Sequence, residues 1–270
     1  MIERKHRLGQ LVFDRDAIVR AALRAYVEAV IANIGPHNFP PCSEPRWTGS
    51  LQHGAFYNGN GSGSYDVVAW TEAGIVGLAY ELGWGPLEQL GLSVDAVTRG
   101  PGDVRAAVPG LPAELEPALV LATTMLFEGA WHKEKLAGVG FWLHGDRVAG
   151  SLFDNPTANG ADRLTTWGLL QNGRLPRVCE PRAAATAAEL DRTRYAPFNA
   201  TLDAVVDRAL TGPTELTTAE LQTLVYPAPD AKRLLGVQRA LQDVGITWPG
   251  SPDLPDPPRP TGRNPFLPRP

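Results

Sequence analysis

Two similar segments, one on each side of an apolar helical stretch, constrain the fold of this chain more than any other feature. The first covers 67–81 and the second covers 139–154. Each reads as an apolar run ending in Trp, a polar turn with Gly, a second apolar run with Gly, an aromatic residue and an acid. This pattern is typical of a β-hairpin. We therefore expect two Trp-bearing hairpins in one antiparallel sheet, with Trp70 and Trp142 on neighbouring strands.

Two amphipathic helices are expected beside this sheet. Apolar residues recur at helical spacing over 14–34, where Asp14 or Asp16 can cap the helix, and over a stretch from about 112 or 117 to 136. The buried stripes are Ile18, Ala22, Tyr26 and Val30 in the first helix, and Leu115, Leu119, Ala122 and Leu126 in the second. The sequence thus predicts an α+β fold in which an antiparallel sheet of four or more strands is flanked by these helices.

The rest of the chain divides into a loop, a helical part and a tail. Residues 37–64 are rich in Pro, Gly and aromatic residues, so we expect a long irregular stretch there. The C-terminal third shows helical patterns, and Thr217 with Glu220 forms a capping-box pair. Nine of the 22 residues from Pro249 onward are proline, which excludes a helix or a central strand. We expect one domain over 8–250, with 171–250 as a candidate helical subdomain, and an extended Pro-rich tail over 251–270.

Composition excludes several classes of function. The formal net charge is −4, which argues against a general nucleic-acid binder. The longest apolar run, 118–127, is about half of a membrane span, and no secretory signal follows the N-terminus. The two cysteines, Cys42 and Cys179, lack metal-ligand spacing. We expect a cytoplasmic protein that contacts neither nucleic acid nor membrane, and the wealth of Ala, Arg, Gly and Pro suits a bacterial genome of high GC content.

No motif for a cofactor or metal is found. The Gly-rich run 58–64 precedes a strand and holds no Lys, whereas nucleotide loops follow a strand and open a helix. The set His37, Cys42 and His53 does not match the spacing of a closed zinc site. Serine-nucleophile, Walker A and dinucleotide-binding patterns are missing. We therefore expect neither a cofactor nor a metal, and dehydrogenases, kinases and P-loop enzymes are disfavoured.

Four residues form the candidate catalytic set if the chain is an enzyme. Glu128 and His132 lie one helical turn apart, which suits a general base and its orienting carboxylate, or else a surface pair at a helix end. Glu81 and Asp154 occupy equivalent ends of the two hairpins and would approach each other in a shared sheet. Two carboxylates in different environments can act as acid and base, whereas acids after a strand more commonly just enter a turn.

Five aromatic residues are the candidate binding residues: Trp47, Phe56, Tyr57, Trp70 and Trp142. Aromatic side chains near turns either pack in the core or form a contact patch. The leading hypothesis is a non-catalytic protein that binds another protein and occludes it, as immunity proteins and antitoxins do. One alternative is a hydrolase that uses His132 with nearby carboxylates. The other is a structural or assembly subunit that docks through its Pro-rich tail.

Overall fold

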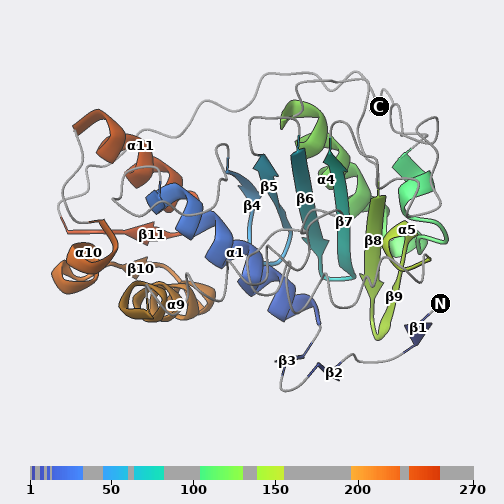
Figure 1. Cartoon of the computed structure of the whole chain (residues 1–270), viewed down its shortest axis with the longest axis horizontal. Coiled ribbons are helices and arrows are strands. Elements are labelled where there is room, and N and C mark those ends of the chain that lie inside the picture. Colours follow the sequence, from blue (N-terminus) through green and yellow to red (C-terminus); the bar gives the residue numbers. More distant parts are fainter. Residues whose placement is uncertain are drawn as a thin grey trace.

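An antiparallel sheet forms the centre of the molecule. The structure is a computed structural model, and it describes residues 2–3, 7–8, 11–12, 14–32, 45–59, 64–81, 104–129, 139–154, 196–225 and 231–249. The strands of the sheet are β4 (Arg46–Gly49), β5 (Gly54–Gly59), β6 (Ser64–Thr71), β7 (Gly74–Glu81), β8 (Val139–His144) and β9 (Arg147–Ala149). These six strands neighbour one another in chain order, and the two-residue strand β1 (Ile2–Glu3) pairs with β9 at one edge (Figure 1). The sheet is therefore a meander.

The two paired segments of the sequence form the predicted hairpins. Strands β6 and β7 pair along their whole length, from Ser64 opposite Glu81 to Thr71 opposite Gly74. Strands β8 and β9 form the second hairpin, around a turn in which Gly145 has a φ of 58°. Because β8 pairs with β7, both tryptophans lie in one sheet, as predicted. The expectation of neighbouring strands is wrong, because β7 separates β6 from β8.

The second hairpin is shorter than its sequence pattern predicted. Strand β9 ends at Ala149, and the chain turns at Gly150 with a φ of 131°. A Cβ at Gly150 would lie 2.5 Å from the Gly140 carbonyl oxygen, so only glycine allows the chain to pass β8 this closely. The short helix α5 (Ser151–Asp154) follows. Asp154 therefore ends a helical turn rather than a strand.

Two strands lie where the sequence predicted a long irregular stretch. Strands β4 and β5 both fall within 37–64 and pair antiparallel to each other. All six residues of β5 are buried, so its residues show no alternation of apolar and polar side chains. β4 has only four residues, and nearby Pro and Gly residues conceal both strands. The expectation of irregular structure is wrong for these two segments.

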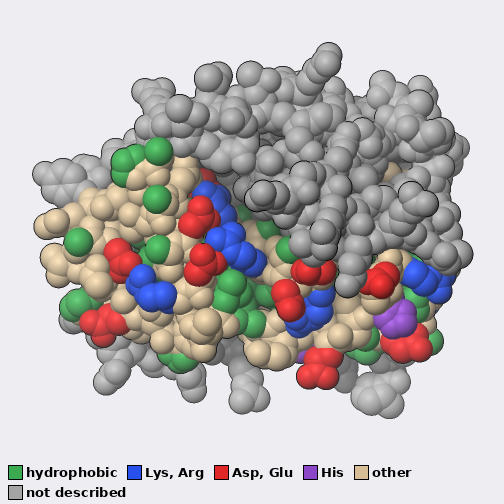
Figure 2. All heavy atoms as spheres, turned by 90° about the horizontal axis from the view of Figure 1, so that it is seen from below, with side chains coloured by type: hydrophobic (Ala, Val, Ile, Leu, Met, Phe, Trp, Pro, Cys, Tyr) green, Lys and Arg blue, Asp and Glu red, His purple; other side chains and the backbone are tan. Residues whose placement is uncertain are grey.

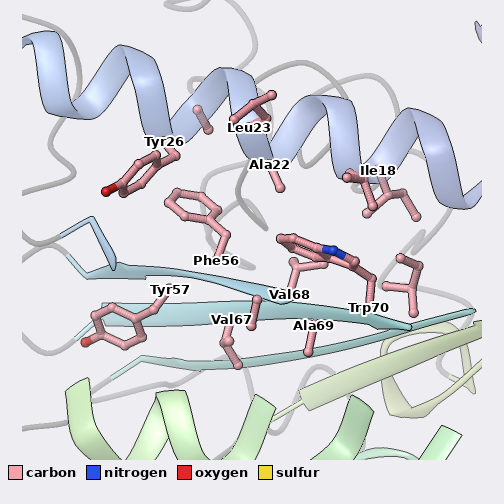
Figure 3. Close-up of a cluster of buried hydrophobic side chains, with 14 of the residues drawn as sticks. Ile18, Ala22, Leu23, Tyr26, Phe56, Tyr57, Val67, Val68, Ala69 and Trp70 are labelled. Atoms are coloured by element: carbon pink, nitrogen blue, oxygen red, sulfur yellow. The ribbon is translucent and has the colours of Figure 1, made fainter. Parts of the chain in front are cut away.

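The sheet is covered on both faces, by α1 (Arg15–Ala32) on one side and α4 (Glu116–Gly129) on the other. Figure 3 shows Phe56, Val68 and Trp70 pointing toward α1, whereas Tyr57, Val67 and Ala69 point the other way. The Ala17 amide donates a hydrogen bond to Asp14 Oδ1 at 2.8 Å, which caps α1 as the sequence suggested. Both predicted stripes are buried: Ile18, Ala22, Tyr26, Val30, Leu115, Leu119, Ala122 and Leu126.

A small helical layer follows in the C-terminal part of the chain. It comprises α9 (Ala196–Thr211), β10 (Thr214–Glu215), α10 (Thr218–Val225), α11 (Ala231–Gln242) and β11 (Ile246–Thr247). Helices α9 and α11 pack against α1, and β10 pairs in parallel with β11 (Figure 1). The α+β class and the helical C-terminal part are thus confirmed. The Pro-rich tail lies outside the described residues.

Four short elements complete the described part of the chain. Strands β2 (Arg7–Leu8) and β3 (Leu11–Val12) form a small antiparallel pair, and the 3-10 helices η2 (Arg105–Ala107) and η3 (Ala113–Leu115) precede α4. None of the helices described has both the length and the apolar character that crossing a bilayer requires.

Candidate functional site

The meander gives the sheet two different ends. The turns β4–β5, β6–β7 and β8–β9 lie at one end, which we call the turn end (residues 50–53, 71–74 and 144–147). The opposite end, which we call the far end, holds Asn58, Asp66, Glu81 and Val139. The two ends differ in the side chains that they hold.

The candidate binding aromatics are mainly core residues. Trp70 is 0 % exposed, Trp142 1 %, and Phe56 and Tyr57 2 % each. Trp47 is half-buried, and its ring centroid lies 4.9 Å from that of Trp70. Side chains this deeply buried stabilise the fold by removing large apolar surfaces from water. A contact surface on this protein must therefore be carried chiefly by other residues.

Tyr26 connects this aromatic cluster to the C-terminal layer. Its ring lies 5.6 Å from that of Trp47 and 6.1 Å from that of Phe56. Burial, with a further contribution from the Asp243 carboxylate, raises the pKa of Tyr26 above its ordinary value. The hydroxyl therefore stays protonated and donates a hydrogen bond to the Ala240 carbonyl oxygen at 3.0 Å. Tyr26 thus ties α1, the sheet and α11 together.

Three candidate catalytic carboxylates belong to elements that run toward the far end or pack beside it. Glu81 is the last residue of β7. Helix α4 begins near the turn end, because Leu115 of the preceding η3 lies beside Gly74. The helix then packs along β5, β6 and β7, so Glu128 lies toward the far end. Helix α5, which ends at Asp154, packs on β8, where the Gly140 amide donates to Ser151 Oγ at 3.0 Å. The side chains of all three carboxylates, and His132 entirely, lie outside the described residues.

A buried polar pair, which the sequence reading did not single out, also lies at the far end. Asn58 and Asp66 stand directly opposite each other on β5 and β6, and they are 7 % and 6 % exposed. Asn58 Oδ1 has no hydrogen-bond partner. A buried polar atom without a partner costs roughly 1–3 kcal/mol. The available sequence signal was an Asn and an Asp bracketing the Gly-rich run next to buried strands.

The turn end is held in place by Arg15, the first residue of α1. Its Nε donates a hydrogen bond to the Thr71 carbonyl oxygen at 2.7 Å, and its Nη2 donates to the carbonyl oxygens of Leu51 and Gln52, both at 2.9 Å. One guanidinium therefore joins the β6–β7 turn, the β4–β5 turn and the start of α1. The five donors of Arg in a fixed planar arrangement suit such multiple contacts.

Ser50 fixes the β4–β5 turn from within. Its amide donates to the His53 carbonyl oxygen at 2.8 Å, and its Oγ accepts hydrogen bonds from the amides of Gln52 and His53 at 3.3 and 3.2 Å. Trp70 Nε1 donates to the Ser50 carbonyl oxygen at 2.8 Å. The turn is therefore tied directly to a fully buried side chain of the core.

Acidic side chains project from and beside the turn end. Glu72 and Asp146 are exposed in the β6–β7 and β8–β9 turns, and Glu114 is exposed on η3. The Asp16 side chain in the first turn of α1 is 88 % exposed. Figure 2 views the molecule from this side and shows red acidic groups, with blue basic ones among them, on this face. Arg147, the exposed basic residue of the third turn, lies over the Trp142 ring at 5.5 Å.

Only one of the three residues His37, Cys42 and His53, considered above as zinc ligands, lies in the described part of the chain. His53 lies exposed in the β4–β5 turn, whereas His37 and Cys42 lie outside the described residues. Among the residues that the structure describes, no three or more His, Cys, Asp and Glu side chains are grouped so that they could hold a metal ion.

No family model, curated protein or solved structure matches the chain.

Proposed function

We propose that the chain is a non-catalytic binding protein that occludes another protein, in the manner of bacterial immunity proteins and antitoxins, and that it does so in the cytoplasm. The observation that carries this proposal is the turn end, where acidic side chains project from turns that Arg15, Ser50 and Trp70 hold in place. Loops positioned by a rigid scaffold are common sites of binding. The partner is expected to present a basic surface.

Two physical properties of the turn end support this role. Turns that are already fixed lose little conformational entropy when a partner docks on them. Exposed carboxylates attract a basic surface over about 10 Å at moderate ionic strength, which accelerates association and makes it sensitive to salt. The carboxylates Glu72, Glu114 and Asp146 are placed for this effect, whereas Asp16 is paired with Arg15 Nη1 at 2.7 Å.

A capture experiment with matched variants tests the proposal. The full chain is immobilised and incubated with lysate of the cells that encode it, and the retained proteins are quantified. The double variant Glu72→Gln/Asp146→Asn removes two carboxylates from the turn end, whereas Glu215→Gln/Asp243→Asn removes two exposed carboxylates from the C-terminal layer. We expect a basic protein to be retained by the wild type and the second variant, and to be lost with the first variant or at high salt.

Equal retention by both double variants would contradict the proposal, as would the lack of any retained protein. Thermal unfolding of each variant is measured first, because a variant that has lost its fold says nothing about the surface. The four replaced carboxylates are exposed, and breaking an exposed ion pair costs about 0–1 kcal/mol, so both variants should fold.

A hydrolase is the second candidate, and the far end favours it. This candidate is supported by Glu81, which ends β7 at the same end of the sheet as the buried Asp66, and by the elements that carry Glu128 and Asp154, which pack on the neighbouring strands. The test is turnover of ester, amide, glycoside and phosphate substrates by the full chain. Activity that His132→Ala abolishes in a folded protein would replace the binding proposal with this one.

A further inference from the structure

We propose that the C-terminal layer (196–225 and 231–249) opens from the rest of the fold as one unit, and that a ladder of charges between α1 and α9 controls the opening. The ladder uses none of the residues proposed for binding, so it stands or falls independently of the binding role. Proteins commonly open in cooperative units that coincide with supersecondary motifs, at a lower free energy than global unfolding. The internal contacts of the layer and its attachment to α1 both point to such a unit.

The layer is tied together from within. Arg208 on α9 donates two hydrogen bonds to the Glu220 carboxylate on α10, at 2.7 and 2.9 Å. Strand β10 pairs with β11, and the Leu216 amide donates to the Thr247 carbonyl oxygen at 2.7 Å, so the two ends of the layer are joined. Its helices also bury apolar side chains of their own: Phe198, Leu202, Val205, Leu224, Val237 and Leu241. These contacts allow the layer to move as one body.

Helix α1 is the main attachment of the layer. Helices α9 and α11 both pack on α1 (Figure 1), and among the residues that the structure describes no strand of the central sheet packs on the layer to a comparable extent. The Tyr26 hydroxyl of α1 donates to the Ala240 carbonyl oxygen of α11 at 3.0 Å. Because one helix holds the layer to the sheet, loss of that attachment frees α9, α10 and α11 together.

The charged ladder aligns α1 with α9. Arg20 Nε donates to Asp207 Oδ1 at 2.7 Å, and Arg24 donates to Asp203 Oδ1 at 2.9 Å and to Asn199 Oδ1 at 2.7 Å. The two arginines are four residues apart, and so are their successive partners, so each set lies along one face of its helix. The partner numbers fall as the arginine numbers rise. The two helices are therefore antiparallel, and the ladder fixes their alignment.

The ladder is exposed at one end and buried at the other. The side chains of Arg20 and Asp207 are 36 % and 57 % exposed, whereas that of Arg24 is 11 % exposed. An exposed ion pair contributes at most about 1 kcal/mol and is weakened by salt. A buried ion pair loses much of its Coulombic attraction to the cost of removing the charges from water. Such an attachment is weaker than the apolar packing of the sheet, so the layer should open first.

Hydrogen exchange of the native full chain, resolved by peptide, tests this device. Amides of α9, α10 and α11 should exchange through one common opening, at least about tenfold faster than the protected amides of β5 to β7. Raising NaCl from about 0.1 M to 1 M shortens the screening length from about 10 Å to 3 Å and should accelerate exchange in the layer relative to the sheet. Arg20→Gln/Arg24→Gln should accelerate it at least about tenfold. The matched control Arg105→Gln breaks an exposed ion pair with Glu116 outside the ladder and should leave the ratio unchanged.

A milder variant keeps the test decisive if Arg20→Gln/Arg24→Gln does not fold. Asp207→Asn removes only the most exposed partner in the ladder, so we expect an acceleration of about threefold that is confined to the layer. The proposal is overturned if the layer and the sheet of the wild type exchange through a single global opening. It is equally overturned if 1 M NaCl, the folded double variant or Asp207→Asn leaves the ratio of layer to sheet exchange unchanged.

Discussion

Trp70 and Trp142 lie in the same sheet but on its opposite faces. Trp70 is opposite Ile75, and Trp142 is opposite Val76. Because Ile75 and Val76 are consecutive residues of β7, they point to opposite faces, and so do their partners. Each indole N–H donates to a backbone carbonyl oxygen, Trp70 to Ser50 at 2.8 Å and Trp142 to Pro109 at 3.0 Å. The two layers of the core thus have equivalent anchors.

Replacing either tryptophan should therefore cost a similar amount of stability. Trp70→Phe and Trp142→Phe each remove one ring and one N–H donor from a fully buried site, so each should lower the free energy of unfolding by about 2 kcal/mol. Urea unfolding measures this. Trp47→Phe is the control, and its half-buried ring should cost clearly less. A loss confined to one of the two buried sites would show that only one face carries the stability.

Arg24 should contribute more to stability than a surface arginine. Its guanidinium donates to Asp203 at 2.9 Å and to Asn199 at 2.7 Å, joining α1 to α9, and it also pairs with Glu28. Arg24→Met keeps the apolar stem but removes the contacts of the guanidinium with Asp203, Asn199 and Glu28, so we expect a loss of about 2 kcal/mol. In the matched variant Arg105→Met, the exposed pair with Glu116 is broken, and the loss should stay below about 1 kcal/mol.

Two glycine substitutions should act in opposite directions. A Cβ at Gly77 would lie 2.0 Å from the Phe141 ring, so Gly77→Ala should destabilise the protein by about 2 kcal/mol or more. Gly236 is exposed inside α11 with no atom within 4 Å of such a Cβ, so Gly236→Ala should stabilise by about 0.5–1 kcal/mol. Chemical denaturation measures the change in the free energy of unfolding for each variant. Two changes of the same sign would contradict the packing described around Phe141.

Acid should weaken the C-terminal layer through Glu220. The Arg208 guanidinium, which donates to the Glu220 carboxylate at 2.7 and 2.9 Å, and the Thr217 amide lower the pKa of Glu220 below its ordinary value of 4.5. A lowered folded-state pKa stabilises the fold above about pH 4.5, and this contribution is lost as the pH falls through the folded-state pKa. Glu220→Gln should therefore be less stable than the wild type at pH 7 and should approach it in acid. A stability difference that does not change with pH would refute this linkage.

Removal of 251–270 should leave the described domain folded. The segment has no apolar periodicity, and Trp248, the last buried residue described, is retained. The Tm of the truncated protein should lie within about 5 °C of the full chain, because a drop of that size already means a loss of well over 1 kcal/mol for a domain of this size. A larger drop would show that the tail belongs to the core.

Local patterns predicted the helices and hairpins, because their signals lie within a few residues of one another. The stripe of α1, the Asp14 cap and the Thr217–Glu220 capping box were all readable in this way, and the capping box forms with a Glu220 amide to Thr217 Oγ1 distance of 3.2 Å. β5 was missed because burial of both faces removes the alternation that marks a strand. The turn end could not be predicted, because the contacts of Arg15 with Leu51 and Thr71 depend on the long-range placement of α1.

The order of strands in the meander has a consequence for how the chain reaches its fold. Strands β4 to β7 are consecutive and pair only with their sequence neighbours, so their contacts form without closing a long loop. Strand β8 joins β7 only after the long connection from Glu81 to Val139, which contains α4, has been closed. Loop closure costs entropy before its contacts form, and distant pairings slow folding. The four-strand unit is thus the natural nucleus, and amides of β5 and β6 should gain protection from hydrogen exchange before those of β8.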